Sequence, residues 1–346
     1  MKFKWILLSL MMFGYTACVE PVHYNMNHTL LEGKVRFVDE EGEPIEGAKV
    51  EVLFTTTPLQ QVDMGKVSFA KHLTTNAEGF IDFHEKALRA GVFPKKEGFW
   101  MTTAGIGQRD HHLRQSDDPT VREYWHLRWE ETVVMYRKIN PRPMYANQFS
   151  GNPPKFNETY ALDLTANDWV RPHGRGVNRD ILFTMEGEAR SEESPPNLLQ
   201  PRRIVEFDVT LTIHFPNDSD GILRVDETAL PGSEVALGRE APENDYEGRM
   251  TIQRSHTNSG LNEKKPVGYW FRVRSRTDPE TGELLGARYG KIIDDVRFGY
   301  GYGRDGFEGG IVFKYILSPD EQRSMEYNAE NLFPNADWNP RRRSME

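Results

Sequence analysis

Tyrosines and glycines alternate in one short segment near the C-terminus, Gly299-Tyr300-Gly301-Tyr302-Gly303. Tyrosine rings on a glycine-rich loop could stack on a sugar or another planar ligand, because they offer a large contact area at a low entropic cost. Trp270 is a further candidate for such a contact. The rings could equally pack across a hairpin, so the sequence leaves both interpretations open.

Residue types that bind metals gather in Asp110-His111-His112, followed by Asp117, Asp118 and His126. Adjacent histidines on an extended strand point to opposite faces, and the spacing fits no zinc signature. We therefore expect a solvated loop, with no metal and no other cofactor. The segment from Phe215 to Gly221 resembles a calcium loop, but Pro216 occupies the first ligand position and cannot bind through its side chain. A turn that ends a strand is the favoured interpretation.

Paired carboxylates for acid–base catalysis are not evident. Asp294 and Asp295 are consecutive on an expected strand, so only one of them can face a given cleft. The sequence contains no nucleophile elbow, P-loop or triad-like order. We therefore expect no catalytic residues and a non-enzymatic protein.

The only cysteine, Cys18, follows a short apolar segment at the N-terminus. Lys2 and Lys4 precede the apolar run from Trp5 to Phe13, and small residues follow, which is the pattern of a secretory signal covering residues 1–17. The apolar run is much shorter than the roughly 20 residues that cross a bilayer. A permanent transmembrane helix is therefore not expected.

Tyr15-Thr16-Ala17-Cys18 resembles the lipobox of bacterial lipoproteins, with Tyr15 where that family prefers leucine. The resemblance implies that Cys18 is acylated and that residues 1–17 are removed. Two or three acyl chains would hold the protein stably to a membrane. Because Val19 rather than aspartate follows the cysteine, the resemblance implies the outer membrane. The alternative is an ordinary signal peptide with a chance cysteine.

The composition of the chain after the signal predicts an acidic, extracytoplasmic protein. The formal net charge of the 346 residues is −9, and removal of Lys2 and Lys4 with the signal would make it −11. An acidic protein is a poor general partner for nucleic acid or for anionic lipid. With no second cysteine there is no intramolecular disulfide. The length predicts two domains, each large enough to bury its own core.

The first domain begins with alternating strands. Gly33 to Val38 places Val35 and Phe37 on one face, and a second strand runs from Ala48 to Phe54 after a turn. The pattern resembles the carboxypeptidase regulatory-like domain, a transthyretin-like β-sandwich of about seven strands. The matching residues are Gly33, Val35, Asp39, Gly42, Pro44, Ile45, Gly47, Ala48, Val50, Thr75, Gly79 and Phe80. The resemblance implies a spacer or stabilising role rather than catalysis.

The rest of the chain is also expected to be β-rich. The predicted sequence of units is a lipidated linker at 18–30, the first sandwich at 31–145 with an insertion at 91–125, a proline-rich linker at 146–158, a second sandwich or jelly roll at 159–332, and a basic tail at 333–346. Ser318-Pro319-Asp320-Glu321 has the pattern of a capping box and predicts one helix over 319–332.

These observations predict a mainly β protein with two sandwich domains in tandem and one C-terminal helix. The favoured function is a membrane-tethered, non-enzymatic lipoprotein with a binding or structural role in the cell envelope, whose partners are the membrane and an envelope protein or glycan. The alternative is a carbohydrate-binding or glycan-processing accessory protein that uses Tyr300, Tyr302 and Trp270.

Overall fold

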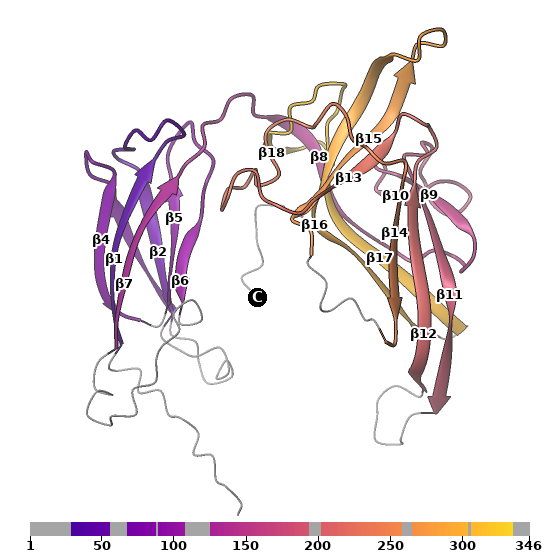
Figure 1. The fold of residues 1–346 in the computed structure, drawn as a ribbon, viewed down its shortest axis with the longest axis horizontal. Coiled ribbons are helices and arrows are strands. Elements are labelled where there is room, and N and C mark those ends of the chain that lie inside the picture. Colours follow the sequence, from indigo (N-terminus) through magenta and orange to yellow (C-terminus); the bar gives the residue numbers. More distant parts are fainter. Residues whose placement is uncertain are drawn as a thin grey trace, which may run out of the picture.

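The structure, a computed structural model, describes residues 29–55, 68–87, 89–107, 125–193, 202–257, 265–303 and 306–334. Every regular element within these ranges is a β-strand, and the strands form four sheets. The sheets pair into two sandwiches that lie side by side with their strands in a similar direction (Figure 1). The expected mainly β class with two sandwiches is therefore confirmed.

The first sandwich consists of a three-stranded and a four-stranded sheet. The three-stranded sheet has the order β4 (Phe80–Lys86), β1 (Thr29–Val38), β7 (Trp125–Val134), and the four-stranded sheet has the order β3 (Ser68–Thr74), β2 (Lys49–Thr55), β5 (Arg89–Lys95), β6 (Ala104–Gly107). Val35 and Phe37 are fully buried in the core while Lys34 is exposed, as the alternation predicts. The β1 strand is central, because it pairs antiparallel with β4 and parallel with β7.

Part of the expected insertion at 91–125 is regular sheet. The β5 strand pairs along its whole length with β2, and β6 pairs with β5. Gly91 and Pro94 weaken the strand pattern of β5 in the sequence, but Ala90 and Val92 are buried between the sheets. The candidate metal-ligand residues Asp110, His111 and His112 lie outside the described residues.

The second sandwich consists of a five-stranded and a six-stranded sheet. The five-stranded sheet has the order β10 (Asp168–Trp169), β9 (Thr159–Asp163), β11 (Ile181–Glu193), β12 (Arg202–His214), β14 (Arg249–Ser255). The six-stranded sheet has the order β13 (Gly221–Val225), β15 (Gly268–Thr277), β16 (Leu284–Gly303), β17 (Gly306–Leu317), β8 (Arg142–Gly151), β18 (Tyr327–Asn331). Val209, Leu211 and Ile213 of β12 face the core, as predicted.

The second sandwich starts earlier than the sequence indicates, at Arg142, before the expected linker at 146–158. Residues 145–151 of β8 pair with β17, and Arg142 and Met144 pair with β18. The prolines that favoured a linker do not interrupt the main ladder, because Pro143 precedes the part of β8 that pairs with β17. The predicted start of the second sandwich at residue 159 is therefore 17 residues too late, because β8 begins at Arg142 (159 − 142).

The helix predicted over 319–332 is wrong, because this segment turns, bridges and then forms β18. The Asp320 carboxylate accepts hydrogen bonds from the Ser318 hydroxyl at 3.2 Å and the Gln322 N–H at 3.0 Å, which makes a local turn from the capping residues. Four consecutive residues, 324–327, are buried. Consecutive burial suits an extended chain covered on both sides, whereas an amphipathic helix buries only one face.

The outer face of the six-stranded sheet is covered by two connections. Leu237, Ala241 and Tyr246 come from the segment between β13 and β14, and Met325 comes from the segment between β17 and β18. Together they form a second core with apolar residues on the outer face of the sheet. Both connections also contact the first sandwich, through Glu234 and through Glu326.

Gly290 provides a sharp test of the packing in the second sandwich. The ring of Phe271, which is fully buried, lies over Gly290, so that a Cβ added at Gly290 would come within 2.1 Å of the ring. We expect Gly290→Ala to lower the free energy of unfolding by about 1–3 kcal/mol through overpacking. Gly299→Ala on the same strand is the matched control, because no heavy atom lies within 4 Å of its added Cβ. Urea unfolding measures both, and equal costs for the two variants would contradict this packing.

Candidate functional site

The residues proposed for ligand contact do not come together. Tyr300 pairs with Gly309 and Tyr302 with Phe307 in the β16–β17 ladder, so the expected glycine-rich loop is strand up to Gly303. Trp270 is only 3% exposed and belongs to the core beneath the two covering connections. Its ring therefore presents no free face to a sugar, and the candidate surface is reduced to Tyr300 and Tyr302.

The lipid-attachment residue Cys18 lies outside the described residues. Among the residues that the structure describes, no helix is long and apolar enough to cross a membrane. Those residues also contain no group of three or more metal-binding side chains close enough to hold an ion.

A hollow of about 630 Å³ lies on the first sandwich, near the start of β1. Its charged rim is largely paired internally: Glu32 lies 3.4 Å from the His84 imidazole and 3.5 Å from Arg128, and Lys71 pairs with Glu85. Because charges of both signs line the hollow, it gives no strong preference for a ligand of either charge.

Contacts between the sandwiches centre on a buried carboxylate. Glu326 is 1% exposed, and its oxygens accept hydrogen bonds from the Trp100 indole at 2.8 Å, from the backbone N–H of Ile139 at 3.1 Å and from that of Asn140. The Arg239 guanidinium Nε lies 3.5 Å from the same carboxylate. A buried charge must be paired and hydrogen-bonded in this way to be tolerated. Glu326 thus ties the second sandwich to the first and to the chain between them.

Arg239 extends this interface to the surface. Its Nη2 atom donates to Glu40 at 2.7 Å and to the Arg137 carbonyl at 3.1 Å, while its guanidinium lies over the Tyr136 ring at 5.8 Å. Glu40 belongs to the turn after β1, and Arg239 belongs to the connection between β13 and β14. One side chain therefore contacts both the first sandwich and the chain that leaves it.

Backbone pairing and a small apolar cluster complete the interface. The Thr103 N–H donates to the Gly232 carbonyl at 2.9 Å, and the Glu234 N–H donates to the Met101 carbonyl at 3.2 Å. We call this set of contacts the domain interface. Its apolar cluster consists of the buried residues Trp100, Tyr136 and Val235, with Val134 and Leu230 packed against them.

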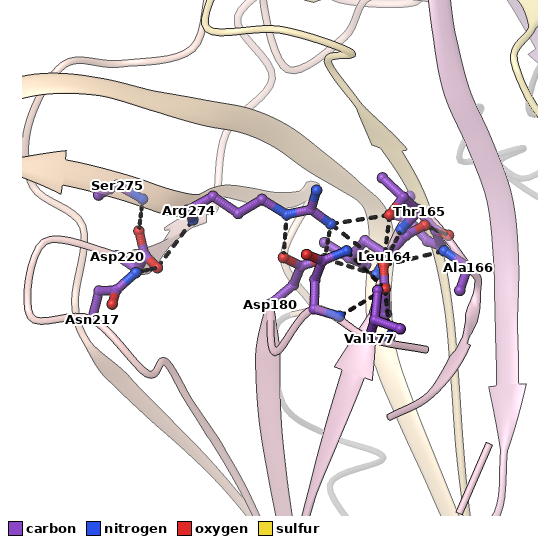
Figure 2. Close-up of polar contacts among 12 residues, drawn as sticks. Leu164, Thr165, Ala166, Val177, Asp180, Asn217, Asp220, Arg274 and Ser275 are labelled. Carbon is purple, nitrogen blue, oxygen red and sulfur yellow. Dashed lines mark hydrogen bonds and ion pairs between the residues drawn. The ribbon is translucent and has the colours of Figure 1, made fainter. Parts of the chain in front are cut away.

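A second polar cluster, the Arg274 network, lies within the second sandwich (Figure 2). The Arg274 guanidinium binds Asp180 through two parallel hydrogen bonds of 2.7 and 2.9 Å, and it donates to the Thr165 hydroxyl at 3.0 Å. Asp180 is fully buried and also accepts from the Leu164 N–H at 2.9 Å. This two-pronged geometry is the strongest form of the arginine–carboxylate pair.

The backbone of Arg274 is held in an uncommon conformation by a neighbouring aspartate. Arg274 has a φ of +57°, which is unfavourable for residues other than glycine. Asp220, 1% exposed, accepts from the backbone N–H of Arg274 at 3.1 Å and from that of Ser275 at 2.9 Å, and Asn217 donates to it at 2.9 Å. The segment that resembled a calcium loop is therefore a turn whose aspartate binds protein groups.

Asp163 is the most saturated carboxylate of the network. One oxygen accepts from the Thr165 N–H and hydroxyl and from the Ala166 N–H, and the other accepts from the Val177 N–H and from the N–H and amide of Asn178, all at 2.6–3.2 Å. Burial by itself would raise the pKa of Asp163, but these hydrogen bonds outweigh it and hold the pKa well below its usual range. A carboxylate whose oxygens accept hydrogen bonds only from protein groups holds the surrounding loops in place. We therefore assign the Arg274 network a structural role.

The depressed pKa of Asp163 predicts a dependence of stability on pH. The folded pKa lies below the unfolded value of about 3.9, so the stabilisation is present above that pH and is lost as the pH falls towards the folded pKa. We expect Asp163→Asn to be less stable than the wild type at pH 7 and the difference to shrink below about pH 4. Urea unfolding of both proteins at pH 7, 4 and 3 measures it. A difference that does not change with pH would contradict this role.

Comparisons with known proteins were made against family models, curated proteins and solved structures. No family model matches the sequence, and no curated protein matches it. A DUF3823 family protein from Parabacteroides merdae is similar over 85% of this chain and 98% of its own, at 7% identity and a TM-score of 0.19. The major pilin SpaD from Corynebacterium diphtheriae is similar over 81% of this chain and 90% of its own, at 11% identity and a TM-score of 0.22.

A 3-chlorocatechol 1,2-dioxygenase from Rhodococcus opacus is similar over 32% of this chain, at 12% identity and a TM-score of 0.23, and the match spans 65% of the length of that enzyme. Similarities at these TM-scores carry no argument about function. The class of protein is therefore defined by the fold of the described residues, which form two β-sandwiches joined through the domain interface.

Proposed function

We propose that this chain is a non-enzymatic protein of the bacterial cell envelope, tethered to the membrane through a lipid on Cys18, whose two sandwiches act as one rigid binding or structural body. The observation that carries the proposal is the buried Glu326 carboxylate, which accepts hydrogen bonds from Trp100 and from the chain between the sandwiches. Two domains that moved independently would not need to bury a charged side chain where they meet.

Rigidity is useful to a tethered protein that presents a surface. When two units are held in one orientation, a partner that contacts both does not lose entropy in aligning them. The backbone pairing of Thr103 with Gly232 and the contact of Arg239 with Glu40 support the same interpretation, because they connect the units at several separate points.

Distance measurements between spin labels test the rigidity. Labels at Lys86 and Glu192, both exposed, report one position on each sandwich, and a Cys18→Ser background leaves no other thiol to be labelled. We expect one narrow distance distribution for the full chain. A broad distribution, typical of domains that move independently, would contradict the proposed function.

The carbohydrate-binding alternative rests on Tyr300 and Tyr302, which are two residues apart on the paired β16–β17 hairpin. A glycan array probed with the wild type and with a Tyr300→Ala/Tyr302→Ala variant decides it. Binding that disappears in the variant, with an unchanged circular dichroism spectrum, would favour the alternative. An array without signal would remove its main support.

A further inference from the structure

The domain interface lies at one end of each sandwich, which we call the closed end. In the first sandwich, β1 runs from Thr29 to Val38, and Glu40, directly after it, contacts Arg239. A ten-residue strand is about 33 Å long, so Thr29 lies roughly that far from the interface. The start of β1 is therefore at the opposite end of the first sandwich.

The second sandwich has the same polarity. Its β8 strand begins at Arg142, whose backbone N–H donates to the Glu326 carbonyl at 2.8 Å, and Leu317 at the end of β17 pairs with Tyr145 near the start of β8. The β16–β17 hairpin, Gly303 paired with Gly306, consequently ends far from the interface. The β11–β12 hairpin also points away from the closed end (Figure 1).

Because the sandwiches lie side by side, these distant ends share one side of the molecule, which we call the open end. Figure 1 shows the start of β1 and the β11–β12 hairpin directed to the same side, with the chain between the sandwiches crossing at the other. An end-to-end arrangement would instead have placed the second sandwich far from the start of β1.

We propose that the open end faces the membrane and that both sandwiches stand on it, with the closed end pointing away. The inference rests on the proposed lipid at Cys18. Thr29 lies eleven positions after Cys18, and a chain of that length reaches at most about 40 Å. To turn the closed end to the membrane, this chain would have to span nearly the whole first sandwich, which strongly restricts its conformations.

Energy transfer from protein to membrane tests this orientation without requiring acylation in cells. The chain from Cys18 onward, the mature form that the signal predicts, is coupled through its single thiol to a maleimide lipid in phosphatidylethanolamine–phosphatidylglycerol vesicles that contain an acceptor lipid. A donor dye is attached through a clickable amino acid at one exposed position at a time. Lys86 and Glu192 report the open end, and Glu43 and Glu280 are their matched controls at the closed end.

We expect the efficiency of energy transfer to be at least roughly twofold higher from the open-end positions than from the closed-end positions. The reason is that the two ends would differ by about 30 Å in their distance from the membrane. Equal or reversed transfer would overturn the orientation. Strong transfer from Lys86 but not from Glu192 would also overturn it, because the second sandwich would then not stand on the membrane. Acylation of Cys18 in cells is a separate measurement, so the orientation and the tether can fail independently.

Discussion

Replacing Asp180 with alanine is expected to lower the free energy of unfolding of the second sandwich by about 3–5 kcal/mol. Asp180 is fully buried, and it holds the Arg274 guanidinium through hydrogen bonds of 2.7 and 2.9 Å. Its removal leaves a largely buried positive charge with a weaker partner and deprives the Leu164 N–H of its acceptor. The uncompensated charge is the larger cost, because a buried ion cannot recover its hydration.

The matched control is Arg276→Ala, two residues from Arg274 on the same strand. The pair of Arg276 with Glu321 is solvent-exposed, so its loss should cost no more than about 1 kcal/mol. Urea unfolding followed by tryptophan fluorescence reports the transition through Trp169, which is buried in the same core. Similar costs for Asp180→Ala and Arg276→Ala would show that the network does not stabilise the fold as described.

Replacing Glu326 with alanine is expected to cost about 3–5 kcal/mol and to separate the unfolding of the two sandwiches. The variant leaves the buried Trp100 indole N–H without its carboxylate acceptor, and it also removes the acceptor of the N–H groups of Ile139 and Asn140, whose hydrogen bonds are partly buried. Each unsatisfied buried donor costs about 1–3 kcal/mol. Because these donors belong to the first sandwich and the connecting chain, the loss falls on the coupling between units.

Glu330→Ala is the control for this variant, because Glu330 is an exposed residue only four positions along the chain. We expect calorimetry to record a single transition for the wild type and for Glu330→Ala, and two transitions for Glu326→Ala. A single transition for Glu326→Ala, at the wild-type temperature, would mean that the carboxylate does not couple the sandwiches.

The alternation of apolar and polar residues in the sequence was sufficient to predict much of the sheet structure. The alternation at Val35 and Phe37, and again at Val209, Leu211 and Ile213, predicts the buried faces correctly, because a half-buried strand must alternate along its length. The class of fold follows from such segments. Boundaries were harder to predict. The β8 strand was missed because Pro141 directly precedes it and Pro143 is its second residue, and these prolines suggest a linker.

The helix predicted from Ser318 failed for a different reason. The capping pattern is local, whereas the final structure is decided by burial of residues 324–327 against the sheet and the first sandwich. Tertiary packing overrides a local preference of about a kilocalorie per mole. A single sequence gives no sign of that packing.

The residues of the domain interface and of the Arg274 network could not be recognised from the sequence. Glu326 and Trp100 are separated by 226 residues, and Arg274 and Asp180 by 94. Neither pair has a spacing that marks a motif, and acidic residues are too common in this chain for one to be distinguished. Trp270 is an error in the opposite direction. Its aromatic ring suggested contact with a ligand, but in the structure the residue is buried in a hydrophobic core.

The membrane tether is the premise on which both the proposed function and the proposed orientation depend. Intact mass and detergent partitioning of the wild-type and Cys18→Ser proteins, expressed in a bacterial host, test it most directly. We predict that the wild type carries the added mass of acyl chains and partitions with detergent, while Cys18→Ser does neither. If both proteins are unlipidated and remain in the aqueous phase, Cys18 is not an attachment site and the protein is not a membrane-tethered one.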